Sequence, residues 1–176
     1  MNLVLLRHTR PAEATGRCYG ALDMPLAPDF EADANAALGA VAPPERILSS
    51  PLHRCRALAD LAVERFGVPV SVDPRLAEMD FGRWEGRMWV DIPREEIDLW
   101  AADILTARPH GGETVADLVS RVRAALRDCG GGRALVVTHA GVIRAAAHLS
   151  GERDPWSLSV PYGTTWRWPS FARADL

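Results

Sequence analysis

The sequence predicts an α/β fold with a mostly parallel sheet, and three observations support this. Four short apolar runs have the length of buried strands, at residues 3–6, 46–49, 70–73 and 134–138. The segments between them carry apolar residues at helical spacing. Such alternation is typical of parallel strands connected by helices. The chain has 176 residues, of which 48% are hydrophobic, so we expect residues 1–176 to form a single domain.

The second strand leads into a helix with clear start and stop signals. Ser50 is the expected N-cap, and Pro51 suits the first helical position. Gly67 is expected to end this helix, after an apolar stripe formed by Leu58, Leu61, Ala62 and Phe66.

Further helices are expected in the second half of the chain. Over residues 114–129 apolar side chains recur on one face, and the glycines at 130–132 provide a stop. Another helix is expected at 141–149, directly after His139. The segment 84–109 contains two prolines and mixed charge, so we expect one or two short helices there.

Composition excludes several classes of function. The net charge of −3 gives no general attraction to nucleic acid or to an anionic membrane. No run approaches the roughly 18 apolar residues that a membrane helix needs. The three cysteines lack metal-binding spacing, which fits free thiols in a reducing compartment, so we expect a cytoplasmic protein. Because there is no lysine, an anion site must use arginine, histidine or backbone N–H groups.

Polar residues follow each predicted strand. His8 follows the first, Arg54 lies early in the helix after the second, Glu78 follows the third and His139 closes the fourth. Ligands of parallel sheets bind beyond the carboxyl ends of the strands. We therefore expect these four side chains to meet at one edge of the sheet.

These residue types suit transfer of a phosphoryl group. A neutral imidazole at His8 can attack phosphorus through one nitrogen while the other donates to a backbone carbonyl, which fixes the tautomer. Arg7 and Arg54 offer bidentate donors for the phosphoryl oxygens, and His139 adds another. The helix after His139 is expected to aim backbone N–H groups at the same point.

The leaving oxygen needs a proton, and Glu78 is the candidate donor. A carboxylate that faces a substrate phosphate favours its protonated form, and it can later act as the base on the hydrolytic water. Asp80 is a competing carboxylate. In an extended segment the two would share a face, so an exchange of roles stays open.

Five motifs occur in a fixed order: LLRHT at 5–9, SSPLHR at 49–54, LAEMDFGRWEG at 76–86, GGET at 111–114 and VVTHAGVIR at 136–144. Together they resemble the motifs of the histidine phosphatase superfamily, also called phosphoglycerate mutase-like. The resemblance implies a three-layer α/β/α sandwich and a phosphatase that uses no metal or cofactor. It implies that His8 is the nucleophile and Glu78 the proton donor, and that the phosphate is bound by Arg7, Arg54 and His139.

Within the superfamily, residues 17–20, 23–26 and 80–82 look most like those of alpha-ribazole phosphatases. These enzymes remove phosphate from alpha-ribazole 5′-phosphate in cobalamin biosynthesis. The resemblance makes a small phosphomonoester the expected partner, with Arg17 and Tyr19 at the pocket rim. A sugar-phosphate phosphatase or a phosphoglycerate mutase-like enzyme is the alternative, although the short segment 83–110 favours hydrolysis. The sequence leaves open whether the chain forms a homodimer.

Two positions depart from the family pattern. Thr9 stands where glycine is usual, and a β-branched residue adds bulk and disfavours positive φ. We expect Thr9 to narrow the pocket or to place its hydroxyl against the phosphate. Ala140 replaces another common glycine, should be tolerated at a helix start, and is, like Thr9, a candidate contact for the substrate.

Other hypotheses remain at this point. Thr9 is the one feature that favours a non-catalytic protein that binds phosphorylated ligands. His110 and Glu113 would suit a metal-dependent hydrolase, but no third ligand has matching spacing. Glu113 could instead approach the pocket or cap a helix. Aromatic candidates to stack on a flat leaving group are Trp84, Trp89 and Tyr162.

Overall fold

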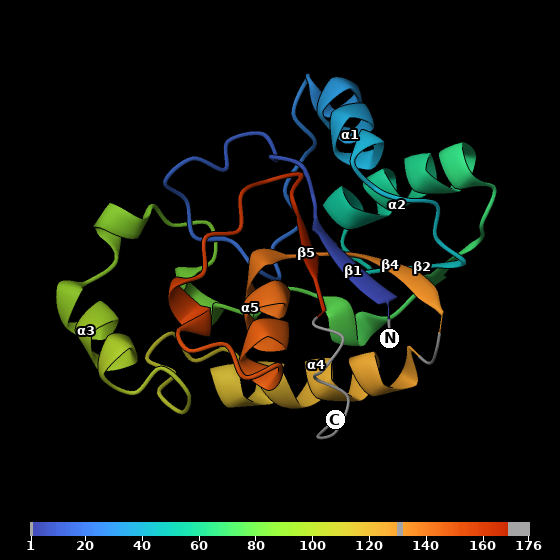
Figure 1. Ribbon diagram of the computed structural model, residues 1–176. Coiled ribbons are helices and arrows are strands. Elements are labelled where there is room, and N and C mark those ends of the chain that lie inside the picture. The colour runs from blue at the N-terminus through green and yellow to red at the C-terminus, as the bar shows by residue number, and fades with distance from the viewer. Residues whose placement is uncertain (1, 130–131, 169–176) are drawn as a thin grey trace.

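The computed structural model describes residues 2–129 and 132–168 and is built on a five-stranded sheet (Figure 1). The strand order is β3-β2-β4-β1-β5. The first four strands along the chain pair in parallel, as predicted, whereas the last is antiparallel to β1. Their bounds are β1 Asn2–Arg7, β2 Arg46–Ser49, β3 Val70–Val72, β4 Arg133–Thr138 and β5 Thr165–Arg167.

Helices cover both faces of this sheet, which confirms the three-layer α/β/α arrangement (Figure 1). One face packs on α1 (Phe30–Gly39) and α2 (His53–Phe66), and the other on α4 (Val115–Asp128) and α5 (Ala140–Leu149). Successive residues of a strand face opposite sides. Leu5 therefore joins the α4 and α5 cluster, while Leu6 joins the cluster with α1 and α2.

The predicted start of α2 is wrong. The helix begins at His53, and its N-cap is Leu52, which makes no side-chain cap hydrogen bond. Ser50 has another role: its Oγ lies 2.7 Å from Nε2 of His139 and 3.3 Å from the amide nitrogen of Leu52. The predicted stop is confirmed, because Gly67 follows the helix in the left-handed conformation at φ 69°.

The helices of the second half agree with their predicted positions. Thr114 caps α4 in a reciprocal arrangement with the side chain of Asp117, while two of the expected stop glycines, 130 and 131, lie outside the described residues. The segment 84–109 holds the 3₁₀ turn Trp89–Asp91 and helix α3, Arg94–Ala102.

Parallel pairing brings the predicted site together. Residues Arg7 and Thr138 are partners in the ladder of β1 and β4, so the positions that follow them are adjacent. The backbone N–H of His8 donates to the carbonyl of Thr138 at 2.9 Å, and that of Ser50 donates to Val137 at 3.0 Å. The ends of β1, β2 and β4 thus meet at one edge of the sheet.

Candidate active site

His8 is held as a neutral imidazole with one nitrogen available. Its Nδ1 lies 2.7 Å from the carbonyl oxygen of Thr9. A carbonyl can only accept, so Nδ1 carries the hydrogen and Nε2 keeps its lone pair. The side chain is 1% exposed, and this burial, followed by the charge of Arg54, holds the pKa of His8 well below its usual range. The predicted tautomer-fixing contact is present.

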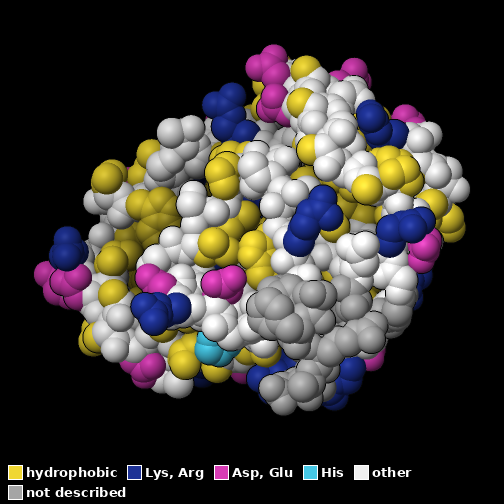
Figure 2. All heavy atoms as spheres, viewed as in Figure 1, with side chains coloured by type: hydrophobic (Ala, Val, Ile, Leu, Met, Phe, Trp, Pro, Cys, Tyr) yellow, Lys and Arg dark blue, Asp and Glu magenta, His cyan; other side chains and the backbone are white. Residues whose placement is uncertain are grey.

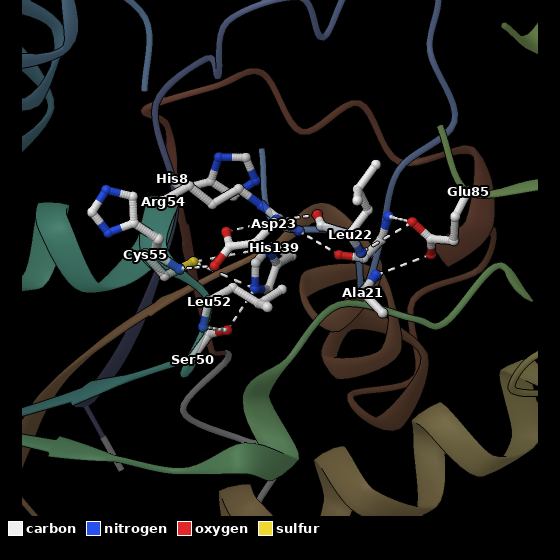
Figure 3. A network of polar contacts seen from close by, with 12 residues as sticks. His8, Ala21, Leu22, Asp23, Ser50, Leu52, Arg54, Cys55, Glu85 and His139 are labelled. Carbon is white, nitrogen blue, oxygen red and sulfur yellow. Dashed lines mark hydrogen bonds and ion pairs between the residues drawn. The ribbon is translucent and has the colours of Figure 1, made fainter. Parts of the chain in front are cut away.

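Arg54 lies beside His8 and is equally buried, at 1% exposure (Figure 3). Its two terminal nitrogens donate to the carbonyls of Leu22 at 2.9 Å and Gly20 at 2.6 Å. Asp23 Oδ1 lies 3.6 Å from Nη1. The guanidinium therefore anchors the loop over the site, while its Nε–H is buried and has no partner among the described residues.

Arg7 places a second guanidinium next to His8. It donates to the carbonyl of Val160, and it lies 3.7 Å from the ring centre of Tyr162. Its Nε–H is also buried without a partner in the part of the chain that the structure describes. Buried donors are normally satisfied, and an oxyanion next to His8 would suit two charged N–H groups.

His139 completes the cluster as the N-cap of α5 (Figure 3). Its ring centre lies 5.1 Å from that of His8, edge to face. Complete burial, followed by the charges of His8 and Arg54, holds the pKa of His139 well below its usual range. The structure thus brings Arg7, His8, Arg54 and His139 together as the sequence predicts.

Glu78 faces this cluster from the loop after β3, and two amides orient it. The N–H of Met79 donates to Oε1 and that of Gly141 to Oε2, each at 3.0 Å. The Gly141 contact corrects one expectation, because this amide at the start of α5 binds the Glu78 carboxylate rather than remaining available for a phosphate. A helix N-terminus favours a negative group at this position.

A cavity of about 450 Å³ opens in front of these groups. Arg7, His8 and Glu78 line it. Arg54 and His139 are buried beside His8 and do not belong to its lining. Arg17 and Tyr19, the residues expected at the rim, line it, and so do Ala140, Arg144 and Tyr162.

Residues 3–164 match the histidine phosphatase superfamily (branch 1). The chain belongs to this superfamily.

Similar proteins carry phosphatase names. The chain is 33% identical to a glucosyl-3-phosphoglycerate phosphatase of Mycolicibacterium vanbaalenii, over 89% of this chain and 77% of that protein. It is 36% identical to an adenosylcobalamin/alpha-ribazole phosphatase of Salmonella typhimurium, over 58% of this chain and 54%, or about half, of that protein. The alpha-ribazole phosphatase structure from Shigella flexneri superposes with a TM-score of 0.78, at 28% identity, covering 94% of this chain and 88% of that one. These names support a phosphatase activity for this histidine phosphatase.

Three residues named from the sequence lie away from the catalytic cavity. Thr9 lines a separate cavity with Arg10 and Asp33 and not the catalytic cavity, so it neither narrows the phosphate pocket nor places its hydroxyl there. Its φ is not positive, so its backbone is unstrained. Asp80 is exposed and accepts from the N–H of Gly82 at 2.7 Å. Trp84 is 0% exposed, and its indole N–H donates to Glu96, so it cannot stack on a leaving group.

Arg144 is a site residue that the sequence arguments did not single out. It lines the catalytic cavity, and its Nε–H donates to the carbonyl of Leu158 at 3.1 Å. Burial lowers the pKa of its guanidinium, an effect that the charge of Glu78 opposes. Helical spacing indicates this position, because Arg144 lies one turn after Ala140 and therefore on the same face of the helix.

Arg121 on α4 is a second functional residue that no sequence motif identifies. Its guanidinium donates to the carbonyls of Arg75 and Ala77 at 2.7 Å and of Glu78 at 3.1 Å. Glu113 binds the same guanidinium, at 2.6 Å and 2.8 Å. Glu113 therefore neither caps α4 nor enters the cavity. Together with Arg121 it holds the backbone that carries Glu78.

The described residues contain no group of three or more His, Cys, Asp and Glu side chains arranged to hold a metal ion. His110 is buried beside Trp84, with ring centres 4.9 Å apart, and its Nδ1 accepts from the N–H of Gly112 at 3.0 Å. Within the same residues, no helix is both long and apolar enough to cross a membrane.

Proposed function

We propose that this chain is a metal-independent phosphomonoesterase that works through a phosphohistidine on His8. One observation carries the proposal: the Nδ1–H of His8 is committed to the Thr9 carbonyl, so Nε2 is a buried nucleophile beside the guanidinium groups of Arg7 and Arg54. In this proposal those groups supply the positive charge that a transferring phosphoryl group requires.

The reaction has two steps. His8 Nε2 attacks phosphorus while the bond to the leaving oxygen breaks, and Glu78 gives that oxygen a proton. Glu78 then takes a proton from water, whose oxygen attacks the phosphohistidine and returns His8 to its neutral form. Arg7 and Arg54 hold the equatorial oxygens in both steps, with His139 as a further donor.

Alpha-ribazole 5′-phosphate is the substrate we propose first, which places the enzyme in cobalamin biosynthesis. The Salmonella typhimurium and Shigella flexneri relatives carry that activity in their names. Cys18, Cys55 and Cys129 are buried and form no disulfide, which supports a reducing compartment and hence the cytoplasm.

A phosphomonoester panel that includes alpha-ribazole 5′-phosphate tests this proposal, with phosphate release as the readout. We expect turnover that survives chelator and falls at least about 10³-fold in the His8→Ala variant. No turnover of any phosphomonoester, or full activity in His8→Ala, would contradict the proposal.

A phosphorylated sugar acid is a second candidate substrate, and Arg144 is the observation that favours it. Its guanidinium faces the same cavity as Glu78 and could bind a carboxylate two or three bonds from the phosphate. The Mycolicibacterium vanbaalenii relative is named for such a substrate. With Arg144→Gln, KM should rise for 3-phosphoglycerate but not for an uncharged phosphomonoester if this candidate is correct.

A further inference from the structure

A second cavity of about 290 Å³ adjoins the catalytic one. The two share four lining residues, Glu78, Phe81, Trp89 and Arg144. The rest of its wall is almost entirely apolar. It comes from α3, α4, the first turn of α5, the 3₁₀ turn Pro155–Ser157 and the loops at positions 79 and 104: Met79, Trp100, Ile104, Val115, Leu118, Gly141 and Trp156. Figure 2 shows hydrophobic side chains gathered on the left of the molecule, over the region of α3 and α5.

The position of Glu78 gives this cavity a chemical meaning. In the proposed reaction Glu78 delivers a proton to the leaving oxygen, so that oxygen lies next to the carboxyl. The remainder of the leaving group must then continue past Glu78, on the side opposite His8. Glu78 belongs to the walls of both cavities, with His8 and Arg7 on one side only. The second cavity is therefore where a substantial leaving group has room.

The size and lining of the cavity restrict what that group can be. An apolar cavity of about 150 Å³ accommodates benzene, so about twice that volume has room for two fused rings. Trp89, Trp100 and Trp156 offer aromatic surfaces for a flat ring. Charged side chains occur only at the end shared with the catalytic cavity, and the indole N–H of Trp100 is the one buried donor without a partner among the described lining residues. Several hydroxyls of a sugar or polyol would therefore lose water without gaining partners.

We propose that this second cavity is a leaving-group subsite for an uncharged, flat ring system about the size of two fused rings. The inference rests on the proposed phosphatase function, and it names the class of phosphomonoester that the enzyme prefers. Trp156 and Trp100 determine that preference, although they lie outside the phosphate cluster.

Two substrates with the same type of leaving oxygen test the inference. Both 2-(2-naphthyl)ethyl phosphate and glycerol 1-phosphate release a primary alkoxide, so their intrinsic reactivities are similar. We expect kcat/KM to favour the naphthyl substrate by about 30-fold or more. Trp156→Ala should lower this ratio by about 10-fold. Ile104→Trp, which fills the cavity instead of enlarging it, should lower the ratio as well.

Trp166→Ala is the matched control, because Trp166 is a partly buried tryptophan of β5 that lines neither cavity. It should leave the ratio unchanged. If the wild-type enzyme hydrolyses both substrates with similar kcat/KM, or if neither cavity variant changes the ratio, the subsite is wrong while the phosphatase stands. If the wild-type enzyme hydrolyses neither substrate, both proposals are wrong.

Discussion

At the scale of single residues, the site depends on short contacts to backbone atoms. The Thr9 carbonyl fixes the tautomer of His8, and the amides of Met79 and Gly141 fix the carboxylate of Glu78. Thr9 can replace the usual glycine because its carbonyl, not its side chain, contributes to the site. An ordinary backbone conformation suffices there, since Glu13 alone among the described non-glycine residues has a positive φ.

Gly141→Ala is predicted to lower kcat while it raises the free energy of unfolding. A Cβ at this position would lie 2.2 Å from Oε1 of Glu78, so Gly141→Ala should push the carboxyl out of place. We expect kcat for alkyl phosphates to fall about 10-fold or more, since general acid catalysis contributes about 10²- to 10⁴-fold. Removing a helical glycine should meanwhile stabilise α5 by about 0.5–1 kcal/mol.

Gly39→Ala is the control for that variant. Gly39 ends α1, and a Cβ there would meet nothing within 4 Å. Thermal unfolding should show a gain in stability for both variants, with activity lost in Gly141→Ala alone. Full activity in Gly141→Ala would show that Glu78 needs no fixed position.

At the scale of elements, α4 positions the loop that carries Glu78. Arg121 donates to three backbone carbonyls between positions 75 and 78, and it forms an ion pair with Glu113. Such a clamp matters because displacement of a catalytic group by about 1 Å can cost about 10²-fold in rate. We infer that Arg121 is a positioning residue, which acts on the reaction only through Glu78.

Arg121→Gln is expected to lower kcat about 10- to 100-fold for alkyl phosphates. The loss should be smaller for p-nitrophenyl phosphate, whose leaving group needs little protonation, and a merely destabilised protein would not show this difference. Arg121→Lys should rescue poorly, because an ammonium lacks the planar fork. Arg133→Gln removes a more exposed Arg–Glu ion pair, 3.2 Å from Glu45, at the opposite end of β4 and should have no effect. Equal losses on both substrates would contradict a positioning role.

Strong local signals explain which elements the sequence predicts. Strands β1 and β4 are nearly continuous apolar runs, and α4 has a cap and a long apolar stripe, so each could be predicted. Strand β3 is predicted to be buried, but it lies at the edge of the sheet, and Ser71 and Val72 are exposed. Strand β5 has three residues and forms only by pairing with β1, which no local pattern reveals. Ser50 was expected to cap α2 because its residue type suits a cap, but a buried contact with His139 uses its hydroxyl instead.

In the candidate site too, some residues could be predicted from local sequence and others could not. His8, Arg54, Glu78 and His139 follow strand ends, so the topology alone brings them together. Arg121 contacts residues more than 40 positions away in the sequence, as its bonds to Arg75 and Glu78 show, and such contacts depend on how α4 packs. The apolar second cavity likewise exists only once α3, α4 and α5 are assembled.

At the scale of the whole molecule, burying neutral histidines at the site links stability to pH. The folded-state pKa values of His8 and His139 lie below the unfolded value of about 6.5. Below that pH the unfolded chain binds more protons than the folded one, so the free energy of unfolding decreases as pH falls. The limit is about 1.4 kcal/mol per pH unit for each histidine.

Urea unfolding at pH 7.5, 6.5 and 5.5, in a buffer without phosphate, checks this link. The midpoint should change little between the first two values and drop at the third. Burial lowers the pKa of His110 as well, so His8→Asn removes one of three titrating histidines, and its drop should be smaller than that of the wild type. A midpoint that is constant down to pH 5.5 would show that these histidines are not buried as neutral groups.

Trapping the covalent intermediate shows directly whether His8 is the nucleophile. Rapid acid-free quenching with ³²P-labelled substrate, followed by peptide mapping, should find a base-stable, acid-labile phosphoryl group on His8, and His8→Ala should carry no label. Steady turnover without any labelled protein, or label on another residue of the wild-type enzyme, would contradict His8 as the nucleophile.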